Sequence, residues 1–133
     1  MVTIKSKSEI ELMREACRIT ALVHKEIEKN IKPGLSTYDL NQIAEKVIRE
    51  NGAIAAQKGY NCGIRGIPDY PAAICASIND EVIHGIPSKK TIIKEGDIVS
   101  IDLVVYKNGF NGDAARTYIV GNASKEIEKL VSI

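Results

Sequence analysis

The sequence predicts an α+β fold, with an antiparallel-rich sheet and flanking helices, on three observations. Apolar residues recur at helical spacing through the first 50 residues. From Gly59 onward the chain changes to short β-type runs separated by glycine and proline. Between the last two of these runs, Asn108 and Gly109 form the typical pair of a two-residue β-hairpin turn.

The composition is that of an ordinary globular domain. The 133 residues are 44% hydrophobic and 26% charged, and their net charge is +1. No segment gathers the basic residues that binding to a phosphate backbone requires, so we expect no nucleic-acid partner. No apolar run approaches the ~18 residues of a membrane span, and the cysteines (Cys17, Cys62 and Cys75) are dispersed and odd in number. We therefore expect a cytoplasmic protein without a membrane partner.

The first helix is predicted to begin at a capping box formed by Ser8 and Glu11. It is expected to end at residues 32–34, where proline and glycine interrupt the helical pattern. His24 lies beside the apolar pattern, and we expect it to be exposed. The predicted buried face comprises Ile10, Met13, Cys17, Thr20, Val23 and Ile27.

A second helix is predicted to begin at a capping box of Ser36 and Asp39 and to end at a C-cap formed by Asn51 and Gly52. Its expected buried face comprises Leu40, Ile43, Ala44, Val47 and Ile48.

The second half of the chain begins with a loop at residues 59–71, which contain three glycines and two prolines. A loop of this length is usually functional or disordered. Ser124 then caps a third helix, which has no stop signal before Ile133, so we expect the fold to continue beyond these residues. The expected strands between loop and helix are residues 72–78, 82–86, 98–106 and 113–120.

Two aspartates stand out in the predicted hairpin. Asp102 lies in an apolar run that reads as a buried strand, where an unpaired carboxylate is costly. The predicted register places Asp102 opposite Ala115 and Val104 opposite Asp113, so the two aspartates are diagonal neighbours on one face. Their Cβ atoms are then ~7 Å apart or somewhat less. Either the carboxylates converge on a metal ion, or both are solvated hairpin residues.

His84 lies in the apolar run at residues 82–86. Three roles fit a histidine there: a third metal ligand, a hydrogen-bond donor to a substrate, or a hydrogen-bonded core residue.

Several segments closely resemble the type I methionine aminopeptidases. Residues 73–87 are similar to the substrate-histidine segment of that family, and residues 96–102 and 111–117 are similar to its first two metal motifs, in the same order and spacing. Residues 10–16 and 32–37 also match. The resemblance covers essentially the whole chain.

The resemblance implies a pita-bread fold, as in the creatinase and aminopeptidase enzymes, with two pseudo-symmetric halves around a two-metal site. By this resemblance Asp102 binds one metal ion and Asp113 bridges both. His84 contacts the substrate and steadies the tetrahedral intermediate, while Tyr70 and Cys75 line the pocket for the methionine side chain. The implied cofactors are two divalent ions (Co, Mn, Fe or Zn), and the implied substrates are the N-terminal methionine peptides of nascent proteins.

The sequence departs from the family pattern in two places, which affect the expected methionine pocket and the expected set of metal ligands. Ile67 stands three residues before Tyr70, where many members have a second pocket tyrosine. The remaining metal ligands of the family, one histidine and two glutamates, belong to a C-terminal half that residues 1–133 do not contain. We therefore expect these residues to be the N-terminal portion of the catalytic domain.

The leading functional hypothesis is removal of the initiator methionine by a dinuclear metal–hydroxide peptidase, this chain supplying half of the active site. One alternative is a relative that cleaves X-Pro or creatine-like substrates. Another is a non-catalytic pita-bread fragment that acts as a binding or oligomerisation module. We expect the chain alone to be inactive and to self-associate through its uncovered surfaces.

Overall fold

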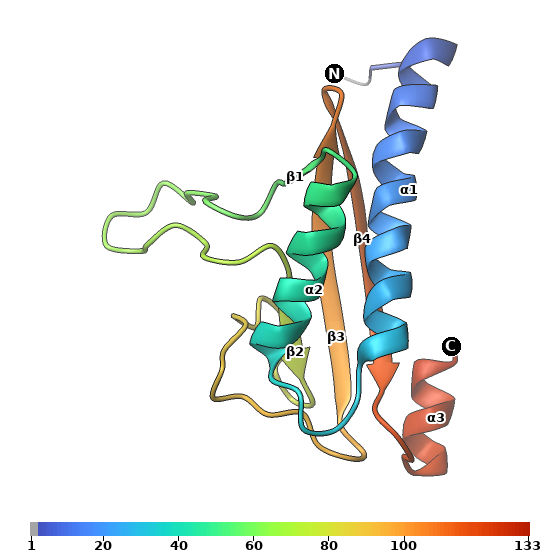
Figure 1. Ribbon diagram of the computed structural model, residues 1–133, viewed down its shortest axis with the longest axis vertical. Coiled ribbons are helices and arrows are strands. Elements are labelled where there is room, and N and C mark those ends of the chain that lie inside the picture. Colours follow the sequence, from blue (N-terminus) through green and yellow to red (C-terminus); the bar gives the residue numbers. More distant parts are fainter. Residues whose placement is uncertain (1–2) are drawn as a thin grey trace.

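Two helices cover one face of a four-stranded antiparallel sheet in a computed structural model, which describes residues 3–133 (Figure 1). The predicted α+β class is confirmed. None of the helices in the described part of the chain is long and apolar enough to cross a bilayer. In chain order the elements are α1 (Lys7–Asn30), α2 (Thr37–Glu50), β1 (Ile54–Ala55), β2 (Cys75–Ile78), β3 (Ile98–Lys107), β4 (Phe110–Ile119) and α3 (Lys125–Val131).

The long hairpin is the centre of the sheet. β4 pairs with β3 along its whole length, and the predicted turn at Asn108 and Gly109 is confirmed. On the other side of β3, β1 pairs with one end and β2 with the other. The alternate residues of β3 that face α1 and α2 are fully buried. The core that they form with both helices includes Ile19, Val23, Ile27, Leu40, Ala44, Ile48, Val99, Ile101, Leu103 and Val105.

The start of α1 differs from the prediction. Ser6 is the N-cap, and its hydroxyl accepts from the Glu9 amide while the Glu9 carboxylate accepts from the Ser6 amide. The capping box therefore lies two residues before the predicted pair of Ser8 and Glu11. Both serines are followed three residues later by a glutamate, so local sequence alone did not distinguish them.

The buried face of α1 is also shifted from the predicted one. Ile10 and Cys17 are exposed. The start of α1, which includes Ile10, extends beyond the tip of the β3–β4 hairpin (Figure 1). Cys17 lies farther along the helix, next to the buried Ala16, where the backbone of α1 contacts Gly112. His24, expected to be exposed, is only 6% exposed. The residues that α1 does bury are Ala16, Ile19, Thr20, Val23, His24 and Ile27.

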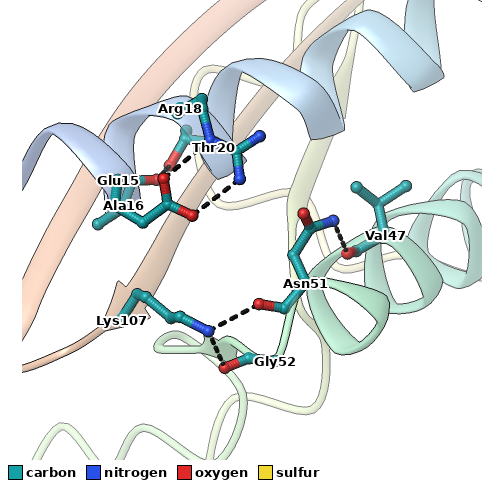
Figure 2. A network of polar contacts seen from close by, with 8 residues as sticks. All are labelled: Glu15, Ala16, Arg18, Thr20, Val47, Asn51, Gly52 and Lys107. Atoms are coloured by element: carbon teal, nitrogen blue, oxygen red, sulfur yellow. Dashed lines mark hydrogen bonds and ion pairs between the residues drawn. The ribbon is translucent and has the colours of Figure 1, made fainter.

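α2 forms as predicted, and its two ends are tied to other parts of the chain. The capping box of Ser36 and Asp39 is confirmed, as is the C-cap at Asn51. At the C-terminal end, the Lys107 ammonium donates to the carbonyls of Asn51 and Gly52 at 2.8 and 2.7 Å (Figure 2). A cation at this end of a helix satisfies carbonyls that lack partners and complements the helix dipole. The contact fixes α2 to the end of β3.

One predicted strand does not form, and one short strand was not predicted. Residues 82–86 form no strand, and Val82 is 88% exposed. The segment is joined to β2 at Gly85, whose carbonyl accepts from the Ala76 amide and whose amide donates to the Ser77 hydroxyl. β1 was missed because it is only two residues long. The predicted loop at residues 59–71 is confirmed, and it extends away from the sheet (Figure 1).

The backbone of α1 comes very close to β4 at Gly112. A Cβ atom on Gly112 would lie 2.6 Å from the Ala16 carbonyl carbon and from the Cys17 nitrogen. Real Cβ atoms do not approach backbone atoms so closely, so only glycine fits there.

We predict that Gly112→Ala lowers the free energy of unfolding by about 1–3 kcal/mol, the usual cost of overpacking a tight contact. This cost exceeds the ~0.4–1 kcal/mol that an alanine gains by restricting the unfolded chain. Urea unfolding measures the difference. Asn111→Ala, at an exposed neighbouring position, is the control and should be nearly neutral. Equal stability of Gly112→Ala and the unsubstituted chain would show that α1 can move away from β4.

Candidate metal and substrate site

The two candidate carboxylates lie on the face of the sheet opposite α1 and α2. Asp102 pairs with Ala115 and Asp113 pairs with Val104, so the predicted register is confirmed without a bulge. Because side chains alternate along a strand, both aspartates project from the same face. Asp102 is half-buried, as expected for the less buried face of β3.

The two carboxylates and their surroundings determine the charge state of Asp102. Burial raises the pKa of Asp102, and the nearby Asp113 carboxylate raises it further. The imidazoles of His84 and His24 act in the opposite direction and lower this pKa. Desolvation and repulsion from Asp113 therefore both disfavour the ionised form of Asp102, and a cation between the two carboxylates would offset both effects.

His84 lies in the loop after β2, where the backbone holds it in an unusual conformation. Its φ is +59°, in the left-handed region that costs a non-glycine residue about 1–2 kcal/mol. The next residue, Gly85, is fixed against β2: its amide donates to the Ser77 hydroxyl at 3.1 Å, and a Cβ there would collide with the Ala76 carbonyl. These contacts hold His84 exposed beside the sheet, which rules out the core-residue alternative among its three possible roles.

Cys75 and Tyr70 lie next to the carboxylates. Cys75 is buried on β2, directly paired with Asp102 on β3. Burial raises the pKa of the Cys75 thiol, and the Asp102 carboxylate adds to this, so the thiol stays protonated at neutral pH. The Tyr70 hydroxyl lies 3.0 Å from the Ile74 carbonyl and 3.2 Å from that of Gly85, to which it donates. Burial raises the pKa of Tyr70 well above its usual value.

The protruding loop places Tyr70 at its base. The amide of Gly59 donates to the Tyr70 carbonyl at 2.8 Å, and the Tyr70 amide donates to the Tyr60 carbonyl at 2.9 Å. The two ends of the loop are thus tied together where it leaves the sheet. Farther out in the loop, the Ile67 side chain is half exposed, and it is not part of the described hydrophobic core.

Sequence reasoning missed Gln57, which follows β1 in the gap between β1 and β2. Its amide nitrogen donates to the Cys75 sulfur at 3.4 Å, and its amide oxygen accepts from the Val104 amide at 3.2 Å. Ser77, which holds the Gly85 amide, was missed as well. No local pattern marks either residue, because both act through contacts between distant segments.

The residues present fit part of a divalent-metal site. Carboxylate oxygens are ligands that such ions accept. None of the ion pairs between residues 3–133 involves Asp102 or Asp113. Among residues 3–133, no group of three or more His, Cys, Asp or Glu side chains is arranged to hold a metal ion. Within this part of the chain, His84 therefore does not join Asp102 and Asp113 as a third metal ligand.

Comparisons with known proteins agree with this geometry. Residues 11–133 match metallopeptidase family M24. The chain is 49% identical to methionine aminopeptidase 1 of Bacillus subtilis strain 168, over 100% of the chain and 50% of that protein. It is 41% identical to the methionine aminopeptidase of Escherichia coli K12, over 99% of the chain and 48% of that protein. It thus spans about half the length of the curated relatives it matches.

Solved structures give the same result. The chain superposes on methionine aminopeptidase from Thermotoga maritima with a TM-score of 0.92 and 38% identity, covering 100% of this chain and 51% of that one. Prolidase from Pyrococcus furiosus matches with a TM-score of 0.76 and 25% identity, over 95% of this chain and 34% of that one. The predicted resemblance and the pita-bread fold are therefore confirmed. On its sequence and its fold, the chain belongs to the M24 family of metallopeptidases.

Proposed function

We propose that this chain is the N-terminal half of the catalytic domain of a methionine aminopeptidase, which removes the N-terminal methionine from nascent proteins. The observation that carries the proposal is the placement of Asp102 and Asp113 on one open face of the β3–β4 hairpin, with Cys75 directly beside Asp102. The 49% identity to a methionine aminopeptidase over the whole chain supports the choice of reaction.

In the proposed enzyme, Asp102 and Asp113 hold two divalent metal ions together with ligands from the second half of the fold. Bound divalent ions acidify water and polarise a peptide carbonyl. The chain's contribution is to keep two ionised carboxylates close together on a rigid sheet. The raised pKa of Asp102 supports this role, because a bound cation would favour the ionised form of its carboxyl group.

The other site residues bind and orient the substrate. Exposed beside the sheet, the His84 ring can donate a hydrogen bond to the substrate backbone and steady the charge that develops on its carbonyl oxygen. The buried thiol of Cys75 and the ring of Tyr70 form apolar, polarisable walls suited to a thioether side chain. Their protonated states keep charge out of this pocket.

An X-Pro peptidase of the same fold is the main alternative within the family. The prolidase from Pyrococcus furiosus is 25% identical to this chain, against 38% for the methionine aminopeptidase from Thermotoga maritima. A non-catalytic binding module is disfavoured because both carboxylates are present and share one face.

The first prediction from the proposed function concerns a full-length protein that contains this chain. Asp113→Asn should abolish peptide cleavage and lower metal content, because Asp113 would be one of the carboxylates that hold the metal ions. His84→Ala should retain the metal and lower kcat by ~10²–10⁴-fold, as expected for loss of a group that acts on bound substrate. Metal analysis and kinetics on a methionyl peptide measure both effects. If His84→Ala lost metal while Asp113→Asn kept it, the two roles would be wrongly assigned.

The second prediction concerns the 133-residue chain itself, in which two carboxylates form only part of a ligand set. It should bind Mn²⁺ with a stoichiometry of one or less and a Kd of about 10⁻⁴ M or weaker. Calorimetric titration measures both quantities, and the Asp102→Asn/Asp113→Asn double variant is the control that should not bind. Tight binding of two ions by this chain would contradict the idea that it carries half of the site.

The third prediction is that the 133-residue chain is catalytically silent and self-associates. The site face is open, and α3 buries none of its residues, with Leu130 65% exposed. Exposed apolar surface tends to find a surface to bury against, and the free edge of β4 can pair with another strand. Light scattering over a concentration series, with a cleavage assay on each fraction, tests both parts. A monomer that cleaves methionyl peptides after metal addition would falsify the half-enzyme proposal.

A further inference from the structure

Three successive turns of α1 contact three alternate residues of β4. The Thr20 hydroxyl donates to the Gly112 carbonyl at 2.8 Å. The His24 Nε2 atom lies 3.2 Å from the Ala114 carbonyl, and because a carbonyl only accepts, Nε2 carries the proton of this bond. One turn later, the Glu28 carboxylate accepts from the Arg116 guanidinium at 3.2 and 3.3 Å. Figure 1 shows α1 and β4 side by side over this stretch.

The spacing of these contacts follows from the geometry of the two elements. Four residues of an α-helix rise ~6.0 Å. Two residues of a strand rise about 6.6 Å. The rises are nearly equal, so side chains at every fourth position of α1 meet every second residue of β4. Thr20, His24 and Glu28 therefore form a regular ladder of contacts.

The first two contacts of this ladder lie on either side of Asp113 in the sequence. Gly112 and Ala114 are its two neighbours in the chain, and their carbonyls accept the bonds from Thr20 and His24. The Asp113 side chain projects from the opposite face of the sheet, beside Asp102. The backbone on both sides of Asp113 is thus held by α1, while its carboxylate remains free on the open face.

Both donors are buried and doubly held. The Thr20 hydroxyl is also 3.1 Å from the Ala16 carbonyl, one turn back in α1 (Figure 2). The His24 Nδ1 atom lies 2.9 Å from the Tyr118 hydroxyl, which is also 3.0 Å from the His24 carbonyl. Tyr118 itself belongs to β4, so the histidine ring contacts this strand at two points. Apolar side chains would fill the same space without the cost of burying polar groups.

We propose that Thr20 and His24 are positioning residues, which hold the backbone around Asp113 so that its carboxylate meets that of Asp102 at the distance a shared metal ion requires. The metal part of this inference rests on the proposed function, whereas the clamp on the backbone does not. The Glu28–Arg116 rung is exposed and three residues beyond Asp113, so it contributes little to that position.

The experiment compares matched pairs of variants in the 133-residue chain. Thr20→Val removes the hydroxyl at nearly constant shape, and Thr20→Ser restores it. His24→Leu removes the donor, and His24→Gln restores an amide N–H at the place of Nε2. Glu28→Gln disrupts the exposed rung and serves as the control. Residue-resolved amide hydrogen exchange reports the backbone of β4, and titration with Mn²⁺ reports the carboxylate pair.

We expect Thr20→Val and His24→Leu each to accelerate exchange at Gly112 and Ala114 by about 10-fold relative to Ile119, since one buried hydrogen bond is worth ~1 kcal/mol. Mn²⁺ binding should weaken by a similar factor. Thr20→Ser and His24→Gln should recover most of both losses, and Glu28→Gln should change neither.

Exchange that is unchanged, or that accelerates uniformly along β4, would overturn the inference and leave Thr20 and His24 as ordinary packing residues. A local change in exchange without weaker Mn²⁺ binding would also overturn the positioning role. If the unsubstituted chain bound no Mn²⁺ at all, the proposed metal site would be contradicted, and the exchange pattern would still decide whether the clamp on Asp113 exists.

Discussion

The register of the β3–β4 hairpin is the constraint on which the rest of the structure depends. Asn108 and Gly109 both have positive φ, of 52° and 87°, as a two-residue turn between twisted strands requires. This turn fixes which residue of β4 faces each residue of β3, and a slip by one would move every side chain of β4 to the other face. The close approach of α1 opposes such a slip. It would replace Gly112 at the contact with α1 by a residue that has a side chain, and not even a Cβ atom fits there. Turn and helix contact therefore specify the same register.

That register separates two chemical environments across a single layer of backbone. One face of β3 packs into a hydrophobic core with α1 and α2. The other carries Asp102 and, from β4, Asp113, with a pKa of Asp102 that burial and its neighbour raise. Two like charges at this separation lower stability when both are ionised. The hydrophobic core on the opposite face stabilises the sheet and offsets this loss of stability. The sheet can therefore keep two neighbouring carboxylates that are suited to binding a cation.

Local signals made the hairpin and α2 predictable from sequence, whereas contacts between distant segments were not. The turn pair and the Ser36 capping box act within a few residues, so both elements and the shared face of the aspartates followed from pattern alone. His24 was misplaced because its burial depends on Tyr118 and Ala114, some 90 residues away. The segment around His84 was misread as a strand because its apolar residues suggested burial, while the positive φ of His84 and the contact of Gly85 with β2 define an exposed bend instead.

The two faces of β4 have different roles: one contacts α1, and the other presents Asp113. On the helix side, carbonyls of β4 accept hydrogen bonds from buried side chains of α1; on the open side, the strand presents a carboxylate. Because backbone dihedrals link neighbouring residues, fixing Gly112 and Ala114 leaves Asp113 little freedom except rotation of its own side chain. Geometry at the open face is thus set from the opposite side of the sheet, where side chains never meet a ligand. Substitutions on α1 can therefore adjust the separation of the two carboxylates without altering any group that contacts them.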